Sequence, residues 1–297
     1  MKILIHFRHF PIAMGRWFDF ALRDLGHEVF SVGNYNGGKI PWGEEFDFPK
    51  YAFAPDLQIP EMTAYPLEEV LEKIDFKPDL ILQAGDVTYL SGKAPCKNVM
   101  LLTDPHAVDY TPRYQHADHV FSMQDFYKTP EQTWIPYGYY PPVHFFQEEK
   151  QSKNFDISLS GLQYPHRIEA VEKLKDAGLR VQSTLGLLYD EYREFYHNAN
   201  MALCFSSKQD LPARFWEGLA MGRLVLMNRV PDLEKLELRE DEHYIGFSSI
   251  EELVEKARFY RINSSAMEKI AAQGWMAVQP HTYYSRAKDL LKVVESL

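Results

Sequence analysis

One arginine and one glutamate stand a single helical turn apart in the segment DLPARFWEGLAMGRLVL, residues 210–226. The segment predicts a helix that begins after Pro212 and ends at Gly222, with a strand directly behind it. At this spacing, Arg214 and Glu217 can form a surface ion pair worth roughly 0.2–0.5 kcal/mol. The helix also starts where an apolar strand ends, and parallel sheets bind ligands at that edge. Two interpretations therefore stay open, an ordinary ion pair and a binding site.

A second group of polar side chains follows the apolar strand predicted at residues 98–104. In the loop LLTDPHAVDY, Asp104, His106 and Asp109 stand close together around Pro105. Ligands of parallel sheets bind where strands end, so we treat these three residues as candidate functional residues. The alternative is local, with Asp104 capping the turn and His106 bonding to the backbone.

Several well-known catalytic signatures are missing from the sequence. No G-x-G-x-x-G follows the first strand, which argues against a dinucleotide-dependent dehydrogenase. The P-loop, H-E-x-x-H and G-x-S-x-G patterns are absent as well. No cysteine or histidine cluster has metal-ligand spacing, so the sequence predicts no metal site.

Short apolar strands alternate with amphipathic helices along the chain, which predicts parallel sheets joined by right-handed crossovers. The proline-rich segment 134–146 interrupts the alternation and is interpreted as a linker. We therefore predict an α/β fold of two Rossmann-like domains that face each other across a cleft. Their expected limits are 1–138 and 139–278, and segment 279–297 forms a C-terminal helix that returns to the first domain. The predicted strands are 2–7, 29–33, 79–84, 98–104, 119–123, 155–161, 180–185, 200–207, 223–228 and 243–248, and the predicted helices are 16–26, 66–74, 166–178, 189–199, 212–222, 250–261 and 283–297.

The composition limits the class of protein. Of 297 residues, 45% are hydrophobic and 14% aromatic, and the formal net charge is −10. An acidic chain repels a polyanion on average, which disfavours nucleic-acid binding. Cys96 and Cys204 lie far apart beside apolar residues, as expected for reduced thiols. Neither a secretory signal nor an apolar run of the ~18 residues that a membrane helix needs is present, and we predict a cytoplasmic protein.

Taken together and in order, several short motifs resemble those of GT-B glycosyltransferases, and specifically of retaining members. Some also resemble the narrower group of spore maturation protein CgeB-like, or group 1, glycosyltransferases. The first set is GHEV at 26–29, IPYG at 135–138 and RFWEGLAMG at 214–222, which is similar to R-x-x-E-x-x-A-x-G; the second is TDPH at 103–106, WIPY at 134–137 and HTYYSR at 281–286. The resemblance covers nearly the whole chain.

The resemblance implies a nucleotide-sugar donor site in the C-terminal domain. Glu217 would accept hydrogen bonds from both ribose hydroxyls, because a carboxylate can take two at once. Arg214 and Arg167 would hold the diphosphate, and Gly161 would let the backbone approach it. The further donor candidates are His166, Lys208, Gln209 and Tyr137.

The implied reaction is transfer of a sugar from a nucleoside diphosphate sugar to an acceptor hydroxyl, with retention and with neither a metal nor another cofactor. Arg167 would stabilise the leaving diphosphate. His106 would contact the donor sugar or orient the acceptor hydroxyl, with Asp104 and Asp109 in the same loop.

Other readings of the sequence stay open. Gln209 stands eight positions before Glu217, where many retaining enzymes have a glutamate, and this favours a non-catalytic nucleotide-sugar-binding protein. A nucleotide-sugar epimerase is a further alternative. The acceptor, whether glycan, small molecule, protein or hydroxymethylated DNA base, is open, as are the oligomeric state and the choice between hexosyl and pentosyl transfer. A DNA acceptor would need a basic face, for which the candidates are Arg8, Lys39, Lys93 and Arg113.

Overall fold

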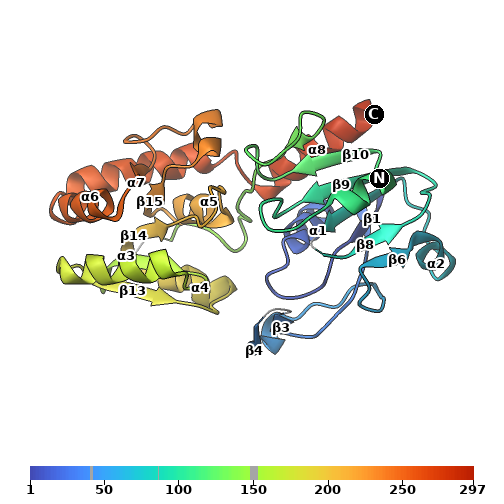
Figure 1. The fold of residues 1–297 in the computed structure, drawn as a ribbon, viewed down its shortest axis with the longest axis horizontal. Helices are drawn as coiled ribbons and strands as arrows, with labels where there is room; N and C mark the ends of the chain where they lie inside the picture. The colour runs from blue at the N-terminus through green and yellow to red at the C-terminus, as the bar shows by residue number, and fades with distance from the viewer. Residues whose placement is uncertain (41–42, 86, 148–152) are drawn as a thin grey trace. The chain divides into compact units, whose positions relative to one another are not determined.

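The computed structural model describes residues 1–40, 43–85, 87–147 and 153–297. The chain divides into two compact units, drawn in sequence colours in Figure 1. Unit 1 comprises Met1–Pro136 and Tyr283–Leu297, and unit 2 comprises Tyr137–Thr282. Each unit has its own parallel sheet, which confirms the predicted α/β fold.

Unit 1 is built on a seven-stranded sheet with the order β11-β10-β9-β7-β1-β2-β5, and every neighbouring pair is parallel. Strands covered on both faces read as nearly continuous apolar runs, which is why the central strands were recognisable in the sequence. The elements of this sheet and its first helix are β1 (Lys2–His6), α1 (Gly15–Asp24), β2 (Glu28–Gly33), β5 (Leu57–Gln58), β7 (Leu80–Gly85), β9 (Lys97–Leu102), β10 (His119–Ser122) and β11 (Thr133–Trp134).

Short elements complete unit 1, and of these the sequence predicted only helix α2 (Leu67–Glu72), which lies within the expected range 66–74. Two small sheets pair β3 with β4 and β6 with β8. Strands of two or three residues carry too little periodicity to be read from a sequence. The remaining elements are β3 (Lys39–Ile40), β4 (Gly43–Asp47), β6 (Ala64–Pro66), β8 (Tyr89–Ser91), α2 (Leu67–Glu72) and the 3₁₀ helices η1 (Pro49–Tyr51) and η2 (Thr111–His116).

The last helix of the chain, α8 (Tyr283–Ser296), belongs to unit 1. Its buried residues include Tyr283, Leu290 and Val294, which lie on one stripe of the helix. The ring of Tyr283 lies 5.6 Å from that of Phe18 and 6.2 Å from that of Trp17 on α1. The chain therefore ends by packing on the first helix of the unit in which it began.

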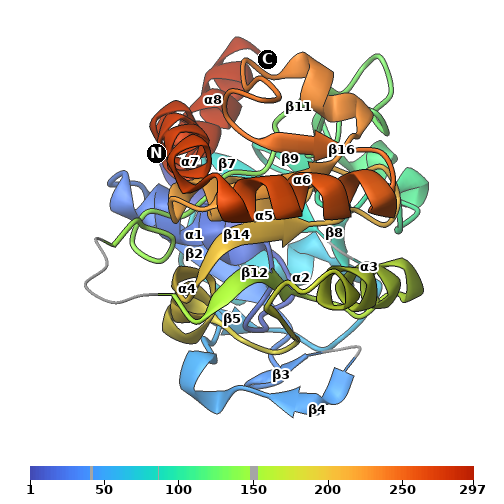
Figure 2. The same cartoon turned by 90° about the vertical axis from the view of Figure 1, so that its left-hand side faces the viewer.

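Unit 2 contains a five-stranded parallel sheet with the order β13-β12-β14-β15-β16, of which β12, β14 and β16 are labelled in Figure 2. Helices cover both faces of the sheet. The elements are β12 (Phe155–Ser160), α3 (Pro165–Asp176), β13 (Val181–Thr184), α4 (Tyr189–His197), β14 (Ala199–Cys204), α5 (Ala213–Ala220), β15 (Leu224–Asn228), the 3₁₀ helix η3 (Pro231–Lys235), β16 (Ile245–Phe247), α6 (Ile250–Ile262) and α7 (Ser264–Val278).

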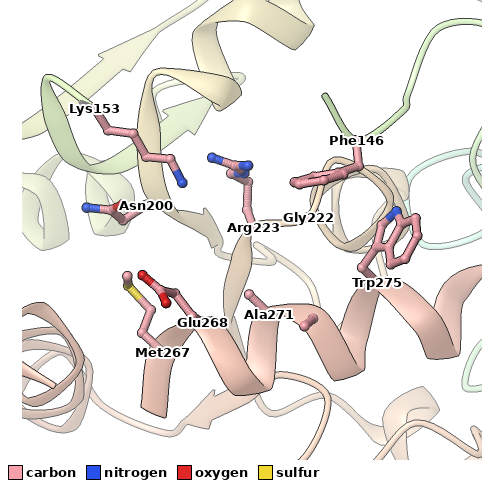
Figure 3. Close-up of a pocket in the computed structure, with 10 residues that line it drawn as sticks. Phe146, Lys153, Asn200, Gly222, Arg223, Met267, Glu268, Ala271 and Trp275 are labelled. Atoms are coloured by element: carbon pink, nitrogen blue, oxygen red, sulfur yellow. The ribbon is translucent and has the colours of Figure 1, made fainter. Parts of the chain in front are cut away.

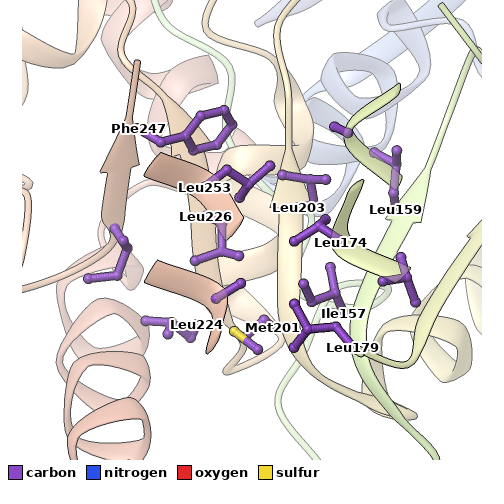
Figure 4. Close-up of a cluster of buried hydrophobic side chains, with 14 of the residues drawn as sticks. Ile157, Leu159, Leu174, Leu179, Met201, Leu203, Leu224, Leu226, Phe247 and Leu253 are labelled. Carbon is purple, nitrogen blue, oxygen red and sulfur yellow. The ribbon is translucent and has the colours of Figure 1, made fainter. Parts of the chain in front are cut away.

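The two faces of this sheet bury different residues because successive side chains point to opposite sides. On one face, strand residues such as Ile157 and Leu226 pack with Leu174 of α3 and Leu253 of α6 (Figure 4). On the other face, Ser158 Oγ donates a hydrogen bond to the carbonyl of Phe195 on α4 at 3.2 Å. Helix α5 also lies on this second face, so α4 and α5 share one side of the sheet.

Helix α7 was missed because a glycine interrupts its pattern. A Cβ on Gly274 would lie 2.8 Å from the Leu219 side chain and still closer to the carbonyl of His243, so close packing requires the glycine. Other helix limits follow local rules, as at α6, where Ser249 Oγ accepts a hydrogen bond from Glu252 N at 3.2 Å. In the part of the chain that the structure describes, no helix is both long enough and apolar enough to cross a membrane.

Candidate active site

Two arginines and one glycine meet where β12 ends in unit 2. Gly161 follows the strand with a φ of +137°, a conformation that is almost restricted to glycine. A Cβ on this residue would lie 2.8 Å from Nη1 of Arg214 and 3.6 Å from Nη1 of Arg167. The absence of a side chain therefore leaves room for both guanidinium groups.

Backbone carbonyls hold Arg167 in place. It belongs to the first turn of α3, and its Nε donates to the carbonyl of Phe205 at 2.7 Å while Nη1 donates to that of Leu162 at 2.9 Å. Burial and the positive charge of Arg214 lower the pKa of Arg167 to about 10. The group is still protonated at neutral pH, so two cations stand next to each other.

Arg214, in the first turn of α5, has a buried Nε for which the described part of the chain supplies no hydrogen-bond partner. Within the described residues, no carboxylate lies within ion-pair distance of Arg167 or Arg214, although Glu217 attracts Arg214 from farther away. Neighbouring cations repel each other, and an anion bound by both relieves the repulsion. Guanidinium groups match phosphate and carboxylate oxygens in geometry, so the pair can hold such an anion.

His166 precedes Arg167 on α3 and is enclosed by aromatic rings. Its ring stacks on Tyr164 at 5.8 Å and meets the edge of Phe205 at 4.7 Å. Burial and the charge of Arg167 lower the pKa of His166, so its imidazole is neutral at pH 7. Its Nε2 is buried without a partner among the described residues.

Lys208 and Gln209 lie in the loop between β14 and α5. Asp210 Oδ1 accepts hydrogen bonds from Ser206 Oγ at 2.6 Å and from the Lys208 amide at 3.3 Å, which closes the loop. Gln209 sits at its tip with a φ of +58°. The side chains of Lys208 and Gln209 are exposed at the carboxyl end of β14, next to β12.

Glu217 is buried, which excludes the interpretation of a surface ion pair with Arg214. Its Oε2 accepts a hydrogen bond from the hydroxyl of Tyr192 at 2.6 Å. Its Oε1 lies 3.7 Å from Nε2 of His144, whose Nδ1 accepts a hydrogen bond from the Tyr140 amide at 3.1 Å. A carboxylate can stand in this apolar helix because α4 and the segment before β12 supply its polar partners.

Sequence reasoning missed both partners of Glu217. Tyr192 stands on another helix and His144 stands in the predicted linker, so no local spacing connects them to the glutamate. The one available signal was the glutamate itself, because a carboxylate among apolar residues needs hydrogen bonds from somewhere. Tyr137, another donor candidate, is the first residue of unit 2 and is only 5% exposed, which leaves little of its ring for a ligand.

In unit 1, the loop after β9 has the three predicted polar residues in different roles. Asp109 Oδ1 accepts a hydrogen bond from the Thr111 amide at 2.9 Å, which lowers the pKa of Asp109 and starts η2. The carbonyl of Asp104 accepts from the amides of residues 107 and 108, and its Oδ2 accepts from Thr103 Oγ1 at 3.1 Å. The His106 ring lies 5.7 Å from that of Tyr127, and its Nδ1 is buried without a partner among the described residues.

The predicted basic face of unit 1 is wrong for two of its four members. Arg8 is buried and pairs with Glu61 at 3.1 Å. Arg113 is also buried, with its guanidinium 4.6 Å from the ring centre of Tyr110. Cations that bind a phosphate backbone must reach the surface, and of the four candidates only Lys39 and Lys93 are exposed.

Family comparison identifies the chain. Residues 143–292, just over half of it, match the family model described as glycosyl transferase-like. The chain belongs to the glycosyl transferase-like family. No curated protein matches this glycosyl transferase-like chain by sequence.

Solved structures show the same fold over the full length of this glycosyl transferase-like chain. An alpha-glucosyltransferase in complex with UDP and a 13-mer DNA aligns with a TM-score of 0.70 at 12% identity, covering 100% of both chains. Anabaena HepE in complex with UDP and glucose aligns at 0.68 with 13% identity, also covering 100% of both. Sucrose-phosphate synthase from Thermosynechococcus elongatus aligns at 0.62 with 13% identity, covering 100% of this chain and 99% of its own. The protein therefore has the GT-B fold.

Unit 2 of this glycosyl transferase-like protein also contains a cavity of about 400 Å³ (Figure 3). Asn200 and Arg223 border it near the amino ends of β14 and β15, and Phe146 and Trp275 form an aromatic wall. Gly161 lies at the opposite edge of the same sheet, so the cavity is separate from the arginine pair. Among the described residues, no group of three or more His, Cys, Asp or Glu side chains is placed to hold a metal ion.

Proposed function

We propose that this protein transfers a sugar from a UDP-sugar to an acceptor hydroxyl, with Arg167 and Arg214 binding the diphosphate. The observation that carries the proposal is the meeting of two guanidinium groups around Gly161, with no carboxylate at ion-pair distance among the described residues. UDP in the solved structures of HepE and of the alpha-glucosyltransferase supports this choice of donor.

In the proposed reaction, the two arginines lie beside the group on which negative charge develops. The bond between the anomeric carbon and the diphosphate oxygen breaks, and a bond from the acceptor oxygen to that carbon forms. Negative charge grows on the departing diphosphate, which takes up the proton of the acceptor hydroxyl. Arg167 is already fixed by the carbonyls of Phe205 and Leu162, so it stabilises this charge without first having to be ordered.

Other donor contacts complete the proposal. The ribose hydroxyls donate to Glu217, whose carboxylate Tyr192 holds in a fixed orientation. Exposed Lys208 and Gln209 contact the phosphate and the sugar from the adjacent loop, while His166 borders the nucleotide. The largely buried Tyr137 would contribute little to this contact. These assignments extend the resemblance of RFWEGLAMG to the donor-binding signature of retaining enzymes.

The finer features of the reaction belong to the same proposal. We assign retention of anomeric configuration, transfer without a metal ion or other cofactor, and membership of the CgeB-like group. In unit 1, His106 contacts the reacting sugar or the acceptor hydroxyl, with Asp104 and Asp109 beside it. Residues 1–138 would form the acceptor-binding domain and residues 139–278 the donor-binding domain. Such a protein would act in the cytoplasm.

One observation favours a second candidate function. Gln209, a neutral amide, stands where many retaining enzymes have a carboxylate, so a protein that binds nucleotide sugars without transferring them is the alternative. Such a protein would bind UDP-glucose and release no UDP from it.

A thermal-shift screen against UDP, GDP and ADP, followed by measurement of UDP release from UDP-glucose, tests the proposal. A ligand at a hundredfold excess over its Kd stabilises the folded state by about 2.7 kcal/mol, which raises the melting temperature by several degrees. We expect this shift with UDP together with slow donor hydrolysis. Binding without hydrolysis or transfer supports the alternative, and no shift with any of the three diphosphates contradicts both.

A further inference from the structure

Two loops of unit 1 leave the sheet side by side. Strands β9 and β10 are parallel neighbours, so the segments that follow them, 103–110 and 123–128, start at the same edge. The rings of His106 and Tyr127 meet between these segments with centroids 5.7 Å apart. The contact brings a predicted functional residue beside an aromatic pair that the sequence analysis did not single out.

An exposed aromatic ring extends this contact outward. Phe126 is 51% exposed, and its ring meets that of Tyr127 edge to face at 5.0 Å. Exposure of a phenyl ring to water costs free energy that burial would recover. The half-exposed ring of Phe126, at the carboxyl ends of the strands, is therefore suited to cover an apolar surface. Phe126, Tyr127 and His106 therefore form one aromatic row, which we call the aromatic edge.

The two segments that carry the aromatic edge have more acidic than basic side chains. The two segments carry three carboxylates, Asp104, Asp109 and Asp125, and one ammonium, Lys128, which pairs with Asp125 at 3.5 Å. Carboxylates accept hydrogen bonds from hydroxyl groups, and an excess of them repels phosphates. The buried Nδ1 of His106, which has no partner among the described residues, adds one more polar group.

We infer that the aromatic edge binds the acceptor and that the acceptor is a neutral saccharide. This inference rests on the proposed function and names its acceptor class. The apolar C–H face of a sugar ring stacks on Phe126 while its hydroxyl groups bond to Asp104 and His106, an arrangement that uses both the aromatic and the acidic character of the edge. A nucleic acid would also stack on the ring but would bring its phosphates against the carboxylates.

Phe126→Ala tests the inference against a matched control. Phe259 on α6 of unit 2 is also 51% exposed, so Phe259→Ala removes an equally exposed ring elsewhere. Each variant is assayed for transfer from UDP-glucose, UDP-galactose and UDP-N-acetylglucosamine to cellobiose, lactose and diacetylchitobiose, and to duplex DNA containing 5-hydroxymethylated bases. UDP affinity and donor hydrolysis without acceptor are measured in parallel.

We expect transfer to at least one disaccharide and none to DNA. Loss of one stacking contact should raise the acceptor KM of Phe126→Ala about tenfold, with kcat, UDP affinity and donor hydrolysis unchanged and Phe259→Ala like the wild type. Transfer to DNA, an unaltered KM in Phe126→Ala, or donor hydrolysis without transfer to any disaccharide would overturn the inference while leaving the proposed function standing. Absence of UDP binding in the wild type would instead overturn the proposed function, and the inference with it.

Discussion

Replacing Arg214 by glutamine should separate ligand binding from folding. The guanidinium is repelled by Arg167 and attracted by Glu217 from beyond ion-pair distance, so the two effects oppose each other in the ligand-free protein. We therefore expect the melting temperature of Arg214→Gln to change little without ligand. With UDP bound, the variant lacks one hydrogen bond from a charged group to phosphate, worth about 1.5–3 kcal/mol.

That loss corresponds to a roughly ten- to hundredfold weaker Kd for UDP, measured by titration calorimetry. At a UDP concentration that stabilises the wild type by about 2.7 kcal/mol, a hundredfold weaker variant gains only about 0.4 kcal/mol, so its thermal shift nearly disappears. Arg258→Gln, at an exposed position on α6, is the control and should bind UDP like the wild type. An unchanged Kd in Arg214→Gln would refute the assignment of the arginine pair to a diphosphate, and a large fall in ligand-free stability would show that Arg214 serves the fold instead.

Four further outcomes follow from the structure. Gly161→Ala should lose about 1–3 kcal/mol of stability through its positive φ and should also weaken UDP binding, because its methyl group displaces the guanidinium of Arg214. Urea denaturation and calorimetry measure the two effects. Tyr192→Phe leaves Glu217 Oε2 without its hydroxyl donor, which should cost about 1–3 kcal/mol in urea denaturation. Hydrogen bonds from Arg229 lower the pKa of Glu252 to about 2. The ionised carboxylate therefore stabilises the fold fully above the ordinary carboxyl pKa of about 4.3, and this stabilisation is lost as the pH falls toward 2. Over that window, the wild type should lose more stability in urea denaturation than Glu252→Gln. Sugar transfer should persist in EDTA, and activity that disappears there and returns with Mn²⁺ would refute the metal-free proposal.

Matched variants distinguish these effects from general damage to the fold. Gly26 has a φ of +84°, and a Cβ added there would have no neighbour within 4 Å. Gly26→Ala should therefore lose stability but keep UDP binding. Tyr260→Phe removes a hydroxyl on α6, which packs on the other face of the sheet from α4 and α5, and should leave stability unchanged. An equal loss of stability in both tyrosine variants would contradict the role given to Tyr192. A Glu252→Gln profile identical to that of the wild type would show that the Arg229 pair adds nothing to stability.

The meeting of Arg167 and Arg214 was predictable because the order of strands and helices fixes it. Arg167 stands at the start of the helix after β12, and Arg214 at the start of the helix after β14. Once β12 and β14 pair in parallel, both helices begin at one edge of the sheet, so the arginines must be close. The alternation of strands and helices therefore predicted the loops in which the two arginines lie, and the family resemblance singled out the arginines themselves. The ligand that they hold is still a proposal.

Whether a given charged side chain is exposed or buried was harder to predict, because the average exposure of its residue type was the only guide. Arginines are mostly exposed, and Arg8 and Arg113 were expected on a surface for that reason. The structure buries Arg113 between aromatic rings, 4.6 Å from the ring centre of Tyr110 and 5.6 Å from that of Tyr89. Tyr110 stands three positions before Arg113, a helical spacing, but the sequence analysis predicted no helix there. Tyr89 lies far from Arg113 in the sequence, so no local sign of that contact was available.

The glutamate at position 217 shows where prediction from sequence ends. Its place on α5, beside Arg214, follows from the helix pattern, but its environment depends on Tyr192 from α4 and His144 from the segment before β12. Buried carboxylates need several polar partners, and distant parts of a chain supply them only after the sheet has brought those parts together. These contacts join α4 and the segment before β12 to the first turns of α5, the helix that also carries Arg214. In the proposed donor site, Glu217 would therefore contribute through the placement of that helix as well as through its contact with the ribose.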